Sequence, residues 1–522
     1  MTNIVLTGFM GTGKTSVGRE VARRLGRPFV DMDAEIETRT GMPISRLFAD
    51  KGEAAFRDLE AQLCRELCQQ QGLVIATGGG TLVDLRNRQG LMASGPVFCL
   101  TCTTDGILRR LAAAQDRPLL DVEDRRREVE RLLSRRQEAY IAIPRQVDTT
   151  LLSVEEVARQ VIEDAISILL PVCHPGGQYA VHLGPGLLAR LGSLVRDAVT
   201  GARIAVVTNE TIAPLYAEPV AESLRRAGLS PFACTIPDGE QHKTIDTLAA
   251  LYAQLVQGDL NRSGTVLALG GGVVCDVAGF AAATYMRGVP VVQVPTTLLA
   301  MMDASVGGKT AVDLAQGKNL VGAFKQPALV VIDPDVLDTL PQPEFASGMA
   351  ELIKHGVLAD PDLFEELGHG PPKRQAWSSC IARSLQVKIN VVEQDPLEHG
   401  LRAVLNLGHT TGHALEQASG FQMRHGEAVS VGMVAAAQIA TVLGLAEPTL
   451  PGRIAAVLAA HGLPVTCPPL HAQSLWAAMG HDKKRHGTAL HWVLPRDIGQ
   501  VEIRADVPAE VVLRVLRDMG AT

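Results

Sequence analysis

The sequence predicts an α/β protein with more than one domain, and three observations carry this prediction. Short apolar runs lead into glycine-rich loops that continue as helical patterns, first at residues 4–25 and again at residues 265–284. Helical patterns dominate the last part of the chain, including the uncharged stretch 428–446. A chain of 522 residues exceeds what one hydrophobic core supports, so we expect two to four domains. The expected order is a parallel sheet with helices, then a Rossmann-like α/β layer, then a mainly helical part.

Composition and charge exclude several classes of protein. With 46% hydrophobic and 20% charged residues, the chain is expected to fold and not to stay disordered. A net charge of −7 argues against a general nucleic-acid or membrane binder, although it allows local basic pockets. No basic leader precedes the strand-like residues 3–7, and polar residues in 428–446 favour a buried helix over a membrane span. The nine cysteines are scattered, and Cys64, Cys68, Cys99 and Cys102, with no second CxxC pair, are expected in the core, which fits a reducing cytoplasm.

A phosphate-binding loop follows the first expected strand. The apolar residues 4–6 lead into GFMGTGKT at residues 8–15, a complete GxxxxGK[ST] motif placed between a strand and a helix. The glycines let backbone N–H groups surround phosphates, Lys14 can reach the β and γ oxygens, and the Thr15 hydroxyl can ligate Mg²⁺. A glycine-rich turn with a chance lysine would rarely show the whole motif in this setting.

Acidic and basic side chains follow the loop at intervals. Asp31 and Asp33 stand two apart at an expected strand end, so we expect both on one face, one near Mg²⁺ and one accepting bonds from substrate hydroxyls. A helix that begins near residue 52 presents Arg57. The strand-like residues 74–77 end in the triple glycine 78–80, which permits close approach of a ligand.

An arginine-rich region closes the first part of the chain. It contains Arg109, Arg110, Arg117, Arg135 and Arg136. Runs of charge are usually solvated faces, but a phosphoryl-transfer site needs mobile cations over its phosphates. A lid over the site is therefore at least as well supported as a solvated face.

In order and spacing, these motifs resemble shikimate kinase, and the resemblance implies a P-loop kinase domain over residues 1–170 that uses ATP and Mg²⁺. The carboxylate of shikimate suits the guanidinium forks of two arginines, which gluconate or nucleoside-phosphate kinases would not need. Shikimate is assigned to Asp33, Arg57, Gly79 and Arg136. ATP is assigned to Gly11, Thr12, Gly13, Lys14, Thr15, Ser16 and Arg117, with Mg²⁺ on Thr15. The expected catalytic residues are Lys14, Asp33 and Arg57.

Strands restart after a joint. Residues 153–168 fit a last amphipathic helix of the first domain, and residues 171–177 are rich in breakers, so we expect a short linker there. Parallel strands are expected at 203–209 and 265–269, with helical patterns between them as in a nucleotide-binding layer. The glycine run that follows the second strand is not GxGxxG and alone is weak support for a dinucleotide.

Basic residues in glycine-rich or apolar surroundings gather in the second half. A solvated surface charge is the better interpretation of any one of them, but solvated lysines are uncommon in such runs. Beside a metal site, the set predicts a phosphorylated, acidic and polyhydroxylated substrate. Its members are Arg287, Lys309, Lys318, Lys354, Lys388 and Arg402.

A metal or catalytic site is predicted near residues 402–427. Asn406, His409, His413 and Glu416 recur at intervals of three, four and three, which on one helix stacks them on one face. His425 follows after a short loop. A lone histidine would be read as a satisfied core residue, but three within seventeen positions favour zinc or catalysis.

From about residue 178 to the end, the chain resembles 3-dehydroquinate synthase. The motifs that carry the resemblance are DGExxK at 238–243, the glycine loop 270–276, DxSVGGKT at 303–310, AELIKH at 350–355 and LNxGHxxGH at 405–413. The resemblance implies an NAD-binding subdomain at 178–340 and a helical metal- and substrate-binding subdomain at 341–522. It implies conversion of DAHP to 3-dehydroquinate with release of phosphate, using NAD and Zn²⁺ or Co²⁺.

The same resemblance assigns individual residues, with Lys309, Lys354 and His413 as catalytic groups. Zinc is assigned to Glu351, His409 and His425. NAD is assigned to Asp238, Gly239, Glu240, Gln241, His242, Lys243, Gly272, Val273, Val274, Cys275, Asp276, Thr296, Thr297, Lys309, Lys318, Val336, Leu337, Asp338 and Thr339. DAHP is assigned to Arg287, Asp303, Lys309, Asn319, Lys354, Lys388, Arg402, Asn406, His413 and Lys484. Cys275 stands where the family pattern leads us to expect glycine.

Together the two resemblances predict a fused cytoplasmic enzyme of chorismate and aromatic amino-acid biosynthesis, dimeric through its second half. Its partners would be small molecules, namely shikimate, ATP and DAHP. One alternative makes the second half another sugar-phosphate cyclase or a metal-dependent polyol dehydrogenase, although the basic set disfavours the dehydrogenase. Another makes one half a degenerate binding or regulatory module, which the complete phosphate-loop and Glu/His/His sets disfavour.

Overall fold

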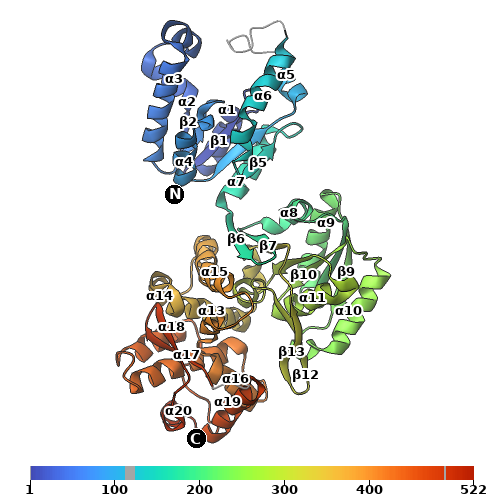
Figure 1. Cartoon of the computed structure of the whole chain (residues 1–522), viewed down its shortest axis with the longest axis vertical. Helices are drawn as coiled ribbons and strands as arrows, with labels where there is room; N and C mark the ends of the chain where they lie inside the picture. The colour runs from blue at the N-terminus through green and yellow to red at the C-terminus, as the bar shows by residue number, and fades with distance from the viewer. Residues whose placement is uncertain (1, 112–123, 487–489) are drawn as a thin grey trace. The chain divides into compact units, whose positions relative to one another are not determined.

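The computed structural model describes residues 2–111, 124–486 and 490–522. The chain forms two compact units, Met1–Ile166 and Ser167–Thr522, each with its own sheet (Figure 1). The expected parallel sheet with helices in the first part of the chain is confirmed. An α/β layer followed by a mainly helical part in the second is confirmed as well.

The first unit is built on a five-stranded parallel sheet in the order β2-β3-β1-β4-β5. Its strands are β1 (Ile4–Gly8), β2 (Phe29–Asp31), β3 (Val74–Ala76), β4 (Val97–Thr101) and β5 (Arg145–Asp148). Its helices are α1 (Lys14–Leu25), α2 (Met32–Thr40), α3 (Ile44–Cys68), α4 (Leu85–Ser94), α5 (Thr104–Leu111), α6 (Arg125–Ile141) and α7 (Val154–Ile166), with a short turn η1 (Thr81–Val83).

Both faces of this sheet are covered because successive side chains of a strand point to opposite faces. Val5 packs in a core with residues of α2, α3 and α6, whereas its neighbours Ile4 and Leu6 pack in a second core with α1 and α7. The strands are therefore apolar on both faces, as parallel sheets between helices are. This layering leaves the carboxyl ends of the strands for a site.

The second unit is built on a seven-stranded sheet in the order β6-β7-β14-β11-β10-β8-β9. All neighbours are parallel except β6, which runs antiparallel to β7. The strands are β6 (Ile168–His174), β7 (Gly177–Leu183), β8 (Arg203–Asn209), β9 (Ser230–Ile236), β10 (Thr265–Gly270), β11 (Val291–Pro295) and β14 (Leu329–Ile332).

The linker expected at residues 171–177 is wrong. Residues 168–174 form β6, and seven residue pairs join it to β7 in a tight hairpin. Pro171, which the sequence suggests as a breaker, lies in a strand at the edge of the sheet, where a missing N–H is tolerated. The described units therefore divide between Ile166 and Ser167, directly after α7.

Helices cover both faces of the second sheet. Val206, Leu267 and Leu269 pack toward the helical part of the unit, whereas Ala205 and Val207 pack toward α10 and α11. The helices of this layer are α8 (Leu191–Ala198), α9 (Glu218–Arg226), α10 (Ile245–Gln257), α11 (Gly272–Thr284) and α12 (Leu298–Met302). A two-stranded hairpin, β12 (Lys309–Leu314) and β13 (Gly317–Phe324), extends from it (Figure 1).

The rest of the second unit is mainly helical. Its elements are α13 (Gln342–Ala359), α14 (Pro361–Gly368), α15 (Trp377–Gln394), α16 (His409–Ala418), α17 (His425–Val442), α18 (Leu450–Ala460), α19 (Ala472–His486), α20 (Ala509–Asp518), β15 (Trp492–Asp497) and β16 (Gln500–Arg504). Short helical turns are η3 (Leu187–Arg190), η4 (Ala213–Ala217), η5 (Glu240–His242), η6 (Tyr285–Arg287), η7 (Pro334–Thr339), η8 (Arg374–Ala376) and η9 (Leu401–Asn406).

Helix α17 lies at the centre of this helical part. Most of its residues are buried, and it packs against α13, α16 and α18. The prediction of a buried helix within 428–446 is confirmed, although the helix begins at His425 and ends at Val442. Among the described residues, no helix is both long and apolar enough to cross a bilayer.

Candidate functional site

The phosphate loop of the first unit has the expected strand–loop–helix geometry. Gly11 and Gly13 adopt φ angles of 80° and 94°, which a residue with a side chain rarely takes, and Gly13 precedes the first turn of α1. The Lys14 ammonium donates to the carbonyl oxygens of Gly8 at 2.9 Å and Phe9 at 3.0 Å. Backbone N–H groups at the start of a twelve-residue helix, next to a lysine, suit an anionic phosphate.

The expectation that Asp31 and Asp33 share a strand face is wrong. Strand β2 ends at Asp31, and Asp33 already lies in α2, because the Asp31 carboxylate accepts the N–H of Asp33 at 3.1 Å and starts the helix. The other oxygen of Asp31 accepts the Thr15 hydroxyl at 2.7 Å. Thr15 and Asp31 thus offer neighbouring hard oxygens, the kind of ligand Mg²⁺ prefers.

The triple glycine is surrounded by charged side chains. The Arg136 guanidinium and the Tyr140 hydroxyl donate to the Gly79 carbonyl at 3.0 and 2.6 Å. A methyl group on Gly78 would stand 2.8 Å from the Asp33 carboxylate, and one on Gly80 would stand 2.8 Å from Arg57. The four residues assigned to shikimate, Asp33, Arg57, Gly79 and Arg136, are therefore brought together.

Glu60 is a buried partner of the site that the sequence motifs do not reveal. Its side chain is only 2% exposed, and it pairs with Arg57 at 2.7 Å while accepting a hydrogen bond from the Thr81 hydroxyl. Glu53 pairs with the same guanidinium at 3.0 Å. The i, i+3 spacing of Arg57 and Glu60 on one helix was the available signal, but such pairs are usually solvated.

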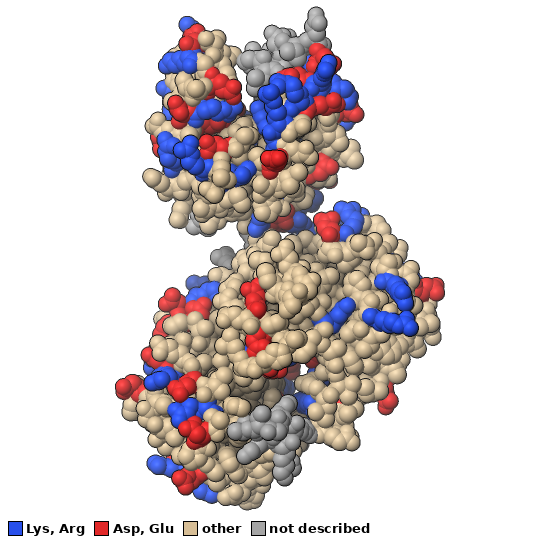
Figure 2. Space-filling view, in the orientation of Figure 1, with Lys and Arg blue, Asp and Glu red and all other residues tan. Residues whose placement is uncertain are grey.

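The arginine-rich region includes a residue that supports the phosphate loop. Arg110 donates to the Gly11 carbonyl at 3.3 Å and to the Thr149 hydroxyl at 2.9 Å, so it braces the phosphate loop. Arginines gather over α5 and α6 in Figure 2. Arg117 lies outside the described residues.

In the second unit, Glu351, His409 and His425 converge from α13, α16 and α17. Their ligand atoms lie within 4.8 Å of one another, and each histidine Nε2 is 3.8 Å from Glu351 Oε1. That oxygen is buried and accepts no hydrogen bond from any described residue. A buried carboxylate oxygen facing two imidazole nitrogens fits a zinc ion with room for a further ligand.

The outer nitrogens of both histidines are occupied. His409 Nδ1 lies 3.1 Å from the Leu407 carbonyl oxygen, and His425 Nδ1 lies 2.8 Å from Glu416 Oε1. If each Nδ1 carries the proton, each Nε2 has a free lone pair directed at Glu351, the arrangement seen around zinc. Glu416, in the predicted stripe but not among the predicted ligands, is thus a partner of the site.

Local charges shift the titration of this group. Burial alone would lower the pKa of His425, but the hydrogen bond to Glu416 and the charge of Glu351 raise it. Burial and the neighbouring Lys354 ammonium lower the pKa of His409 well below its usual range. Burial would raise the pKa of Glu416, yet its bond to His425 brings it to about 2, so Glu416 stays a carboxylate near neutral pH.

The predicted four-residue stripe is only partly a helix face. Asn406 ends the turn η9, and α16 begins at His409 after Gly408, which has a φ of 79°. His413 is exposed on α16, with its ring centroid 5.3 Å from that of His409 and 6.1 Å from that of His425. His409, His413 and Glu416 share the metal face, whereas Asn406 is exposed in the separate segment η9.

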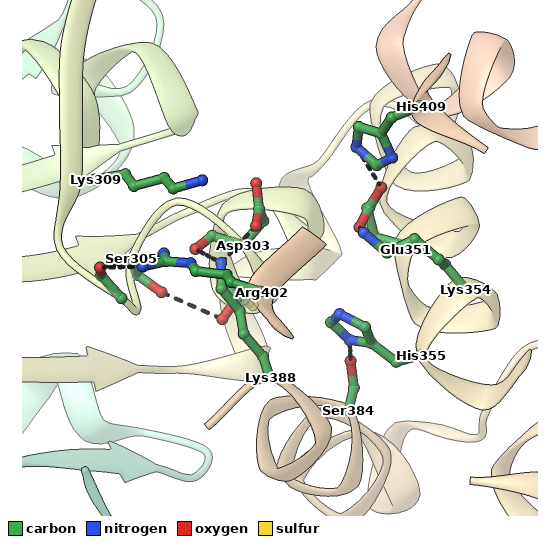
Figure 3. A network of polar contacts seen from close by, with 12 residues as sticks. Asp303, Ser305, Lys309, Glu351, Lys354, His355, Ser384, Lys388, Arg402 and His409 are labelled. Carbon is green, nitrogen blue, oxygen red and sulfur yellow. Dashed lines mark hydrogen bonds and ion pairs between the residues drawn. The ribbon is translucent and has the colours of Figure 1, made fainter. Parts of the chain in front are cut away.

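Three buried cations lie near the metal group. Lys354 pairs with Glu351 on α13, and Lys388 of α15 contacts the side chain and carbonyl of Asp303 (Figure 3). Arg402 donates to the carbonyls of Gly307 at 3.2 Å and Pro396 at 3.0 Å. Burial lowers the pKa of Lys388 although Asp303 raises it. Buried cations in such numbers suit a multiply charged anion.

Among the residues assigned to NAD, residues 272–276, Thr296 and Thr297 lie at the carboxyl end of β10. Gly272 begins the thirteen-residue helix α11, so its N–H groups face this end of the sheet. Lys243 Nζ pairs with Asp276 at 2.6 Å and also donates to Asn319 at 2.6 Å. Burial raises the pKa of Asp276 to about 6, although Lys243 opposes the rise. Cys275 is buried on α11, and its thiol donates to the Gly270 carbonyl oxygen at the glycine turn at 3.8 Å.

Other predicted residues are placed less centrally. Thr339 of η7 shares a 2.6 Å hydrogen bond with Tyr216, and Lys309 pairs with Glu398 at 2.7 Å on the surface. Arg287 is exposed with a φ of 68°, and no described hydrogen bond or ion pair joins it to the metal group. The backbone of Lys484 lies in α19, and its side chain lies outside the described atoms.

One buried pair near the metal group was not predicted. His355 Nδ1 lies 2.6 Å from the Ser384 hydroxyl, which joins α13 to α15 one turn behind Glu351 and Lys388 (Figure 3). Burial and the neighbouring Lys354 lower the pKa of His355 to about 3, so the ring is neutral. A single His in an apolar helix is usually a satisfied core residue, so its sequence position alone does not predict this pair.

Comparison with known families assigns both units. Residues 10–166 match shikimate kinase, residues 233–347 match the N-terminal part of 3-dehydroquinate synthase, and residues 348–485 match its C-terminal part. The 3-dehydroquinate synthase of Symbiobacterium thermophilum is 46% identical over 345 residues, which are 64% of this chain and 96% of that protein. The enzyme of Geobacter metallireducens is 47% identical over 331 residues, 62% of this chain and 92% of that protein.

Solved structures agree with this match. The 2-epi-5-epi-valiolone synthase ValA from Streptomyces hygroscopicus, solved with NAD⁺ and Zn²⁺ bound, is 31% identical with a TM-score of 0.61 over 65% of this chain and 96% of that one. A 2-deoxy-scyllo-inosose synthase complex with NAD⁺ and Co²⁺ is 25% identical, with a TM-score of 0.61 over 67% and 100% of the two chains. The chain belongs to the 3-dehydroquinate synthase family and carries a shikimate kinase domain before it, a fused enzyme of the shikimate pathway.

Proposed function

We propose that residues 1–166 phosphorylate shikimate and that residues 167–522 convert DAHP to 3-dehydroquinate, each at the site described above. The observation that carries the second assignment is the buried Glu351 Oε1, which faces the Nε2 atoms of His409 and His425 at 3.8 Å. The kinase assignment rests on the charged side chains of Asp33, Arg57 and Arg136, which surround Gly78–Gly80.

In the kinase site, the loop residues 11–16 hold the phosphates of ATP, and the Lys14 ammonium contacts the β- and γ-phosphate oxygens. Thr15, supported by Asp31, holds Mg²⁺. Arg57 and Arg136 hold the shikimate carboxylate as charge-assisted forks. Asp33 accepts a hydrogen bond from the substrate hydroxyl and orients it toward the phosphate.

In the synthase site, zinc supplies polarisation of a substrate hydroxyl and NAD supplies reversible acceptance of a hydride. Lys354, Lys388 and Arg402 bind the carboxylate and phosphate of DAHP, because they are the buried cations next to the metal group. His413, exposed beside both zinc-binding imidazoles, holds or relays a proton at a substrate oxygen. Asp303 keeps Lys388 in place through its carboxylate.

A second candidate for this unit is another sugar-phosphate cyclase, as the solved relatives suggest. The two 3-dehydroquinate synthases are 46% and 47% identical, whereas ValA is 31% identical. A substrate analogue that lacks the carboxylate separates the two proposals. We expect the release of phosphate from DAHP and little release from that analogue, since Arg402 and Lys388 would lose an anionic partner. Equal turnover of both would favour the second candidate.

A homodimer formed through the synthase unit and a cytoplasmic location complete the proposal. The nine cysteines are all free thiols, which suits a reducing compartment. Light scattering on a fragment of residues 167–522 would report twice the mass of that fragment if it is a dimer. A mass equal to that of one chain across the working concentration range would reject the dimer.

Two assays test the proposed function directly. One incubates the chain with DAHP, NAD⁺ and Zn²⁺ and follows phosphate, and the other uses shikimate, ATP and Mg²⁺ and follows ADP. Each reaction should proceed alone, because the units have separate sites. Absence of phosphate release with intact ADP formation would reject the synthase assignment and leave the kinase assignment in place.

A further inference from the structure

Glu416 lies between the zinc-binding group and the β12–β13 hairpin. Its Oε1 atom is 2.8 Å from His425 Nδ1, and its Oε2 atom is 3.5 Å from Lys318 Nζ on β13. The side chain is only 5% exposed. One buried carboxylate therefore contacts a metal ligand with one oxygen and the hairpin with the other.

On the metal side, this contact selects the orientation of an imidazole ring. His425 presents Nε2 to Glu351 at 3.8 Å while Nδ1 faces Glu416. A flipped ring would put Cδ2 in the place of Nδ1 and Cε1 in the place of Nε2, so the buried Glu416 carboxylate would lose its donor and Glu351 would no longer face a ring nitrogen. Carboxylate partners of this kind fix the tautomer and orientation of zinc-binding histidines.

On the hairpin side, Lys318 is held by several groups. Its ammonium lies 3.4 Å from Glu240, 3.5 Å from Glu416 and 5.0 Å from the centre of the Phe421 ring. Glu240 belongs to the segment that we assign to NAD, whereas Glu416 and Phe421 belong to the helical part. The hairpin also contacts the helical part through Lys309 and Glu398 at 2.7 Å.

We propose that Glu416 is a positioning residue that couples the orientation of the zinc ligand His425 to the seating of the β12–β13 hairpin. The proposal rests on the zinc site proposed above. A metal on His425 fixes the ring, the ring fixes the carboxylate, and the fixed carboxylate favours the hairpin position in which Lys318 meets it. Because coupling between two sites is reciprocal, the seated hairpin favours metal binding by the same factor.

Three variants of the full chain separate the two contacts. Glu416→Ala removes both contacts, whereas Glu416→Gln keeps an oxygen that accepts the His425 N–H and loses the charge that attracts Lys318. Lys318→Met keeps an apolar stem beside Phe421 and loses only the ammonium. Gln417→Ala, an exposed neighbour on the same helix, is the matched control.

The first readout is zinc affinity, measured by competition with a chromophoric chelator and without turnover. Glu416→Ala should bind zinc about 10- to 100-fold more weakly, the usual effect of losing such a partner. Glu416→Gln, Lys318→Met and Gln417→Ala should stay within about threefold of the original protein, because the ion pair with Lys318 is partly exposed and weak.

The second readout is amide hydrogen exchange of residues 309–324 with and without zinc. Zinc should slow exchange by about threefold in the original protein and in Gln417→Ala. It should have no effect on the hairpin in Glu416→Gln or Lys318→Met, although both bind zinc. A merely structural carboxylate would change stability in all states and would not remove a zinc-dependent difference.

Unchanged zinc affinity in Glu416→Ala, or zinc-dependent protection that persists in Lys318→Met, would overturn the coupling. If Glu416→Ala does not fold, Glu416→Gln and Lys318→Met still decide the matter through exchange. An original protein that binds no zinc would instead reject the proposed zinc site, so the two failures are distinguishable.

Discussion

The guanidinium of Arg57 carries a charge that two neighbouring carboxylates already balance. Glu60 and Glu53 hold it at 2.7 and 3.0 Å, so it is oriented before substrate arrives. Arg57→Ala should lower the kcat/KM for shikimate by roughly a hundredfold or more, because a charge-assisted fork is lost. ADP formation at varied shikimate concentration measures this loss.

A matched control lies in the same element, α3, before its kink at Gly52. Arg46 is exposed and pairs with Asp50 at 3.3 Å, so Arg46→Ala should leave shikimate kinetics within about twofold of the original. Phosphate release from DAHP should not change in either variant. Near-normal shikimate kinetics in Arg57→Ala would remove this residue from the site.

Asp276 gives a pH dependence to the binding of NAD. Burial raises its pKa to about 6, so the folded protein loses the carboxylate as the pH falls through that value. If Asp276 accepts a hydrogen bond from the cofactor, NAD affinity should be highest above about pH 7 and fall toward pH 5. Calorimetric titrations across this range measure the change. Asp276→Asn should bind more weakly and show a flat profile, and a falling profile in that variant would assign the effect to another group.

At the residue scale, motif members could be predicted and their partners could not. Lys14, Arg57 and His409 each belong to a motif whose residue types and spacing are uncommon outside such a site. The motif therefore predicts what each of these side chains binds. Glu60 and Glu416 are carboxylates on helices, where most carboxylates are solvated, and only the folded chain shows that both are buried. Their role depends on contacts with residues 21 and 98 positions away.

Three helices supply the ligands of the proposed zinc site, whereas the first turn of α1 and the end of β2 supply those of Mg²⁺. Glu351 comes from α13, His409 from α16 and His425 from α17, so the group is fixed by the packing of helices. We expect zinc to stay bound to the resting chain and Mg²⁺ to arrive with ATP. After chelation and exchange, Mg²⁺ alone should restore ADP formation, and Zn²⁺ should then restore phosphate release from DAHP.

His409→Ala provides the control for that experiment. The variant should lose bound zinc and phosphate release, while its kinase activity stays unchanged. Metal content is measured by mass spectrometry on the protein before any assay. Revival of both reactions by Mg²⁺ alone, or full zinc content in His409→Ala, would contradict the Glu/His/His assignment.

At the element scale, the periodicity of the sequence predicts which residues share a helix face, but it does not predict where a helix or strand ends. The i, i+4 spacing of His409 and His413 was sufficient to place them on one helix. The interruption before them begins at Leu407, whose ψ of 126° ends η9, and continues at Gly408, whose φ of 79° precedes the first turn of α16. Likewise β2 ends at Asp31 because the Asp31 side chain caps α2. Strand alternation with a period of two does not indicate whether such a side chain continues a strand or starts a helix.

At the scale of the whole chain, β6 belongs to the synthase sheet although it follows directly on the last kinase helix. A fragment of residues 167–522 should fold and keep phosphate release, and residues 1–166 should keep kinase activity. A fragment of residues 178–522 lacks β6, whose Val172 is fully buried, and it leaves β7 as an unpaired edge. We expect its Tm to be lower by roughly 5 °C.

Thermal unfolding of the two synthase fragments under the same zinc and NAD concentrations measures the difference. A fragment of residues 1–170 serves as a control. It adds the first residues of β6 to the kinase unit, and its Tm should equal that of residues 1–166. Equal Tm values for 167–522 and 178–522 would mean that the strand adds nothing to the sheet.

The two-part organisation could be predicted because each half carries a complete set of motifs. The place where the halves meet could not, because proline and glycine at residues 171–177 are as compatible with an edge hairpin as with a linker. Strand β6 pairs with β7 through backbone atoms, which any sequence offers. Only its alternation of buried and exposed residues distinguishes it, and seven residues give a weak signal.

The absence of any residue between α7 and β6 other than Ser167 also bears on how the chain is made. The first sheet is complete at Asp148 and its last helix at Ile166, so nothing synthesised later is needed for the kinase core. At about 5–20 residues per second, the remaining part of the chain takes roughly 20 to 70 seconds to emerge. During the first part of that interval, the kinase can fold on the ribosome and turn over shikimate while the synthase sheet still awaits its central strands, which end at Ile332.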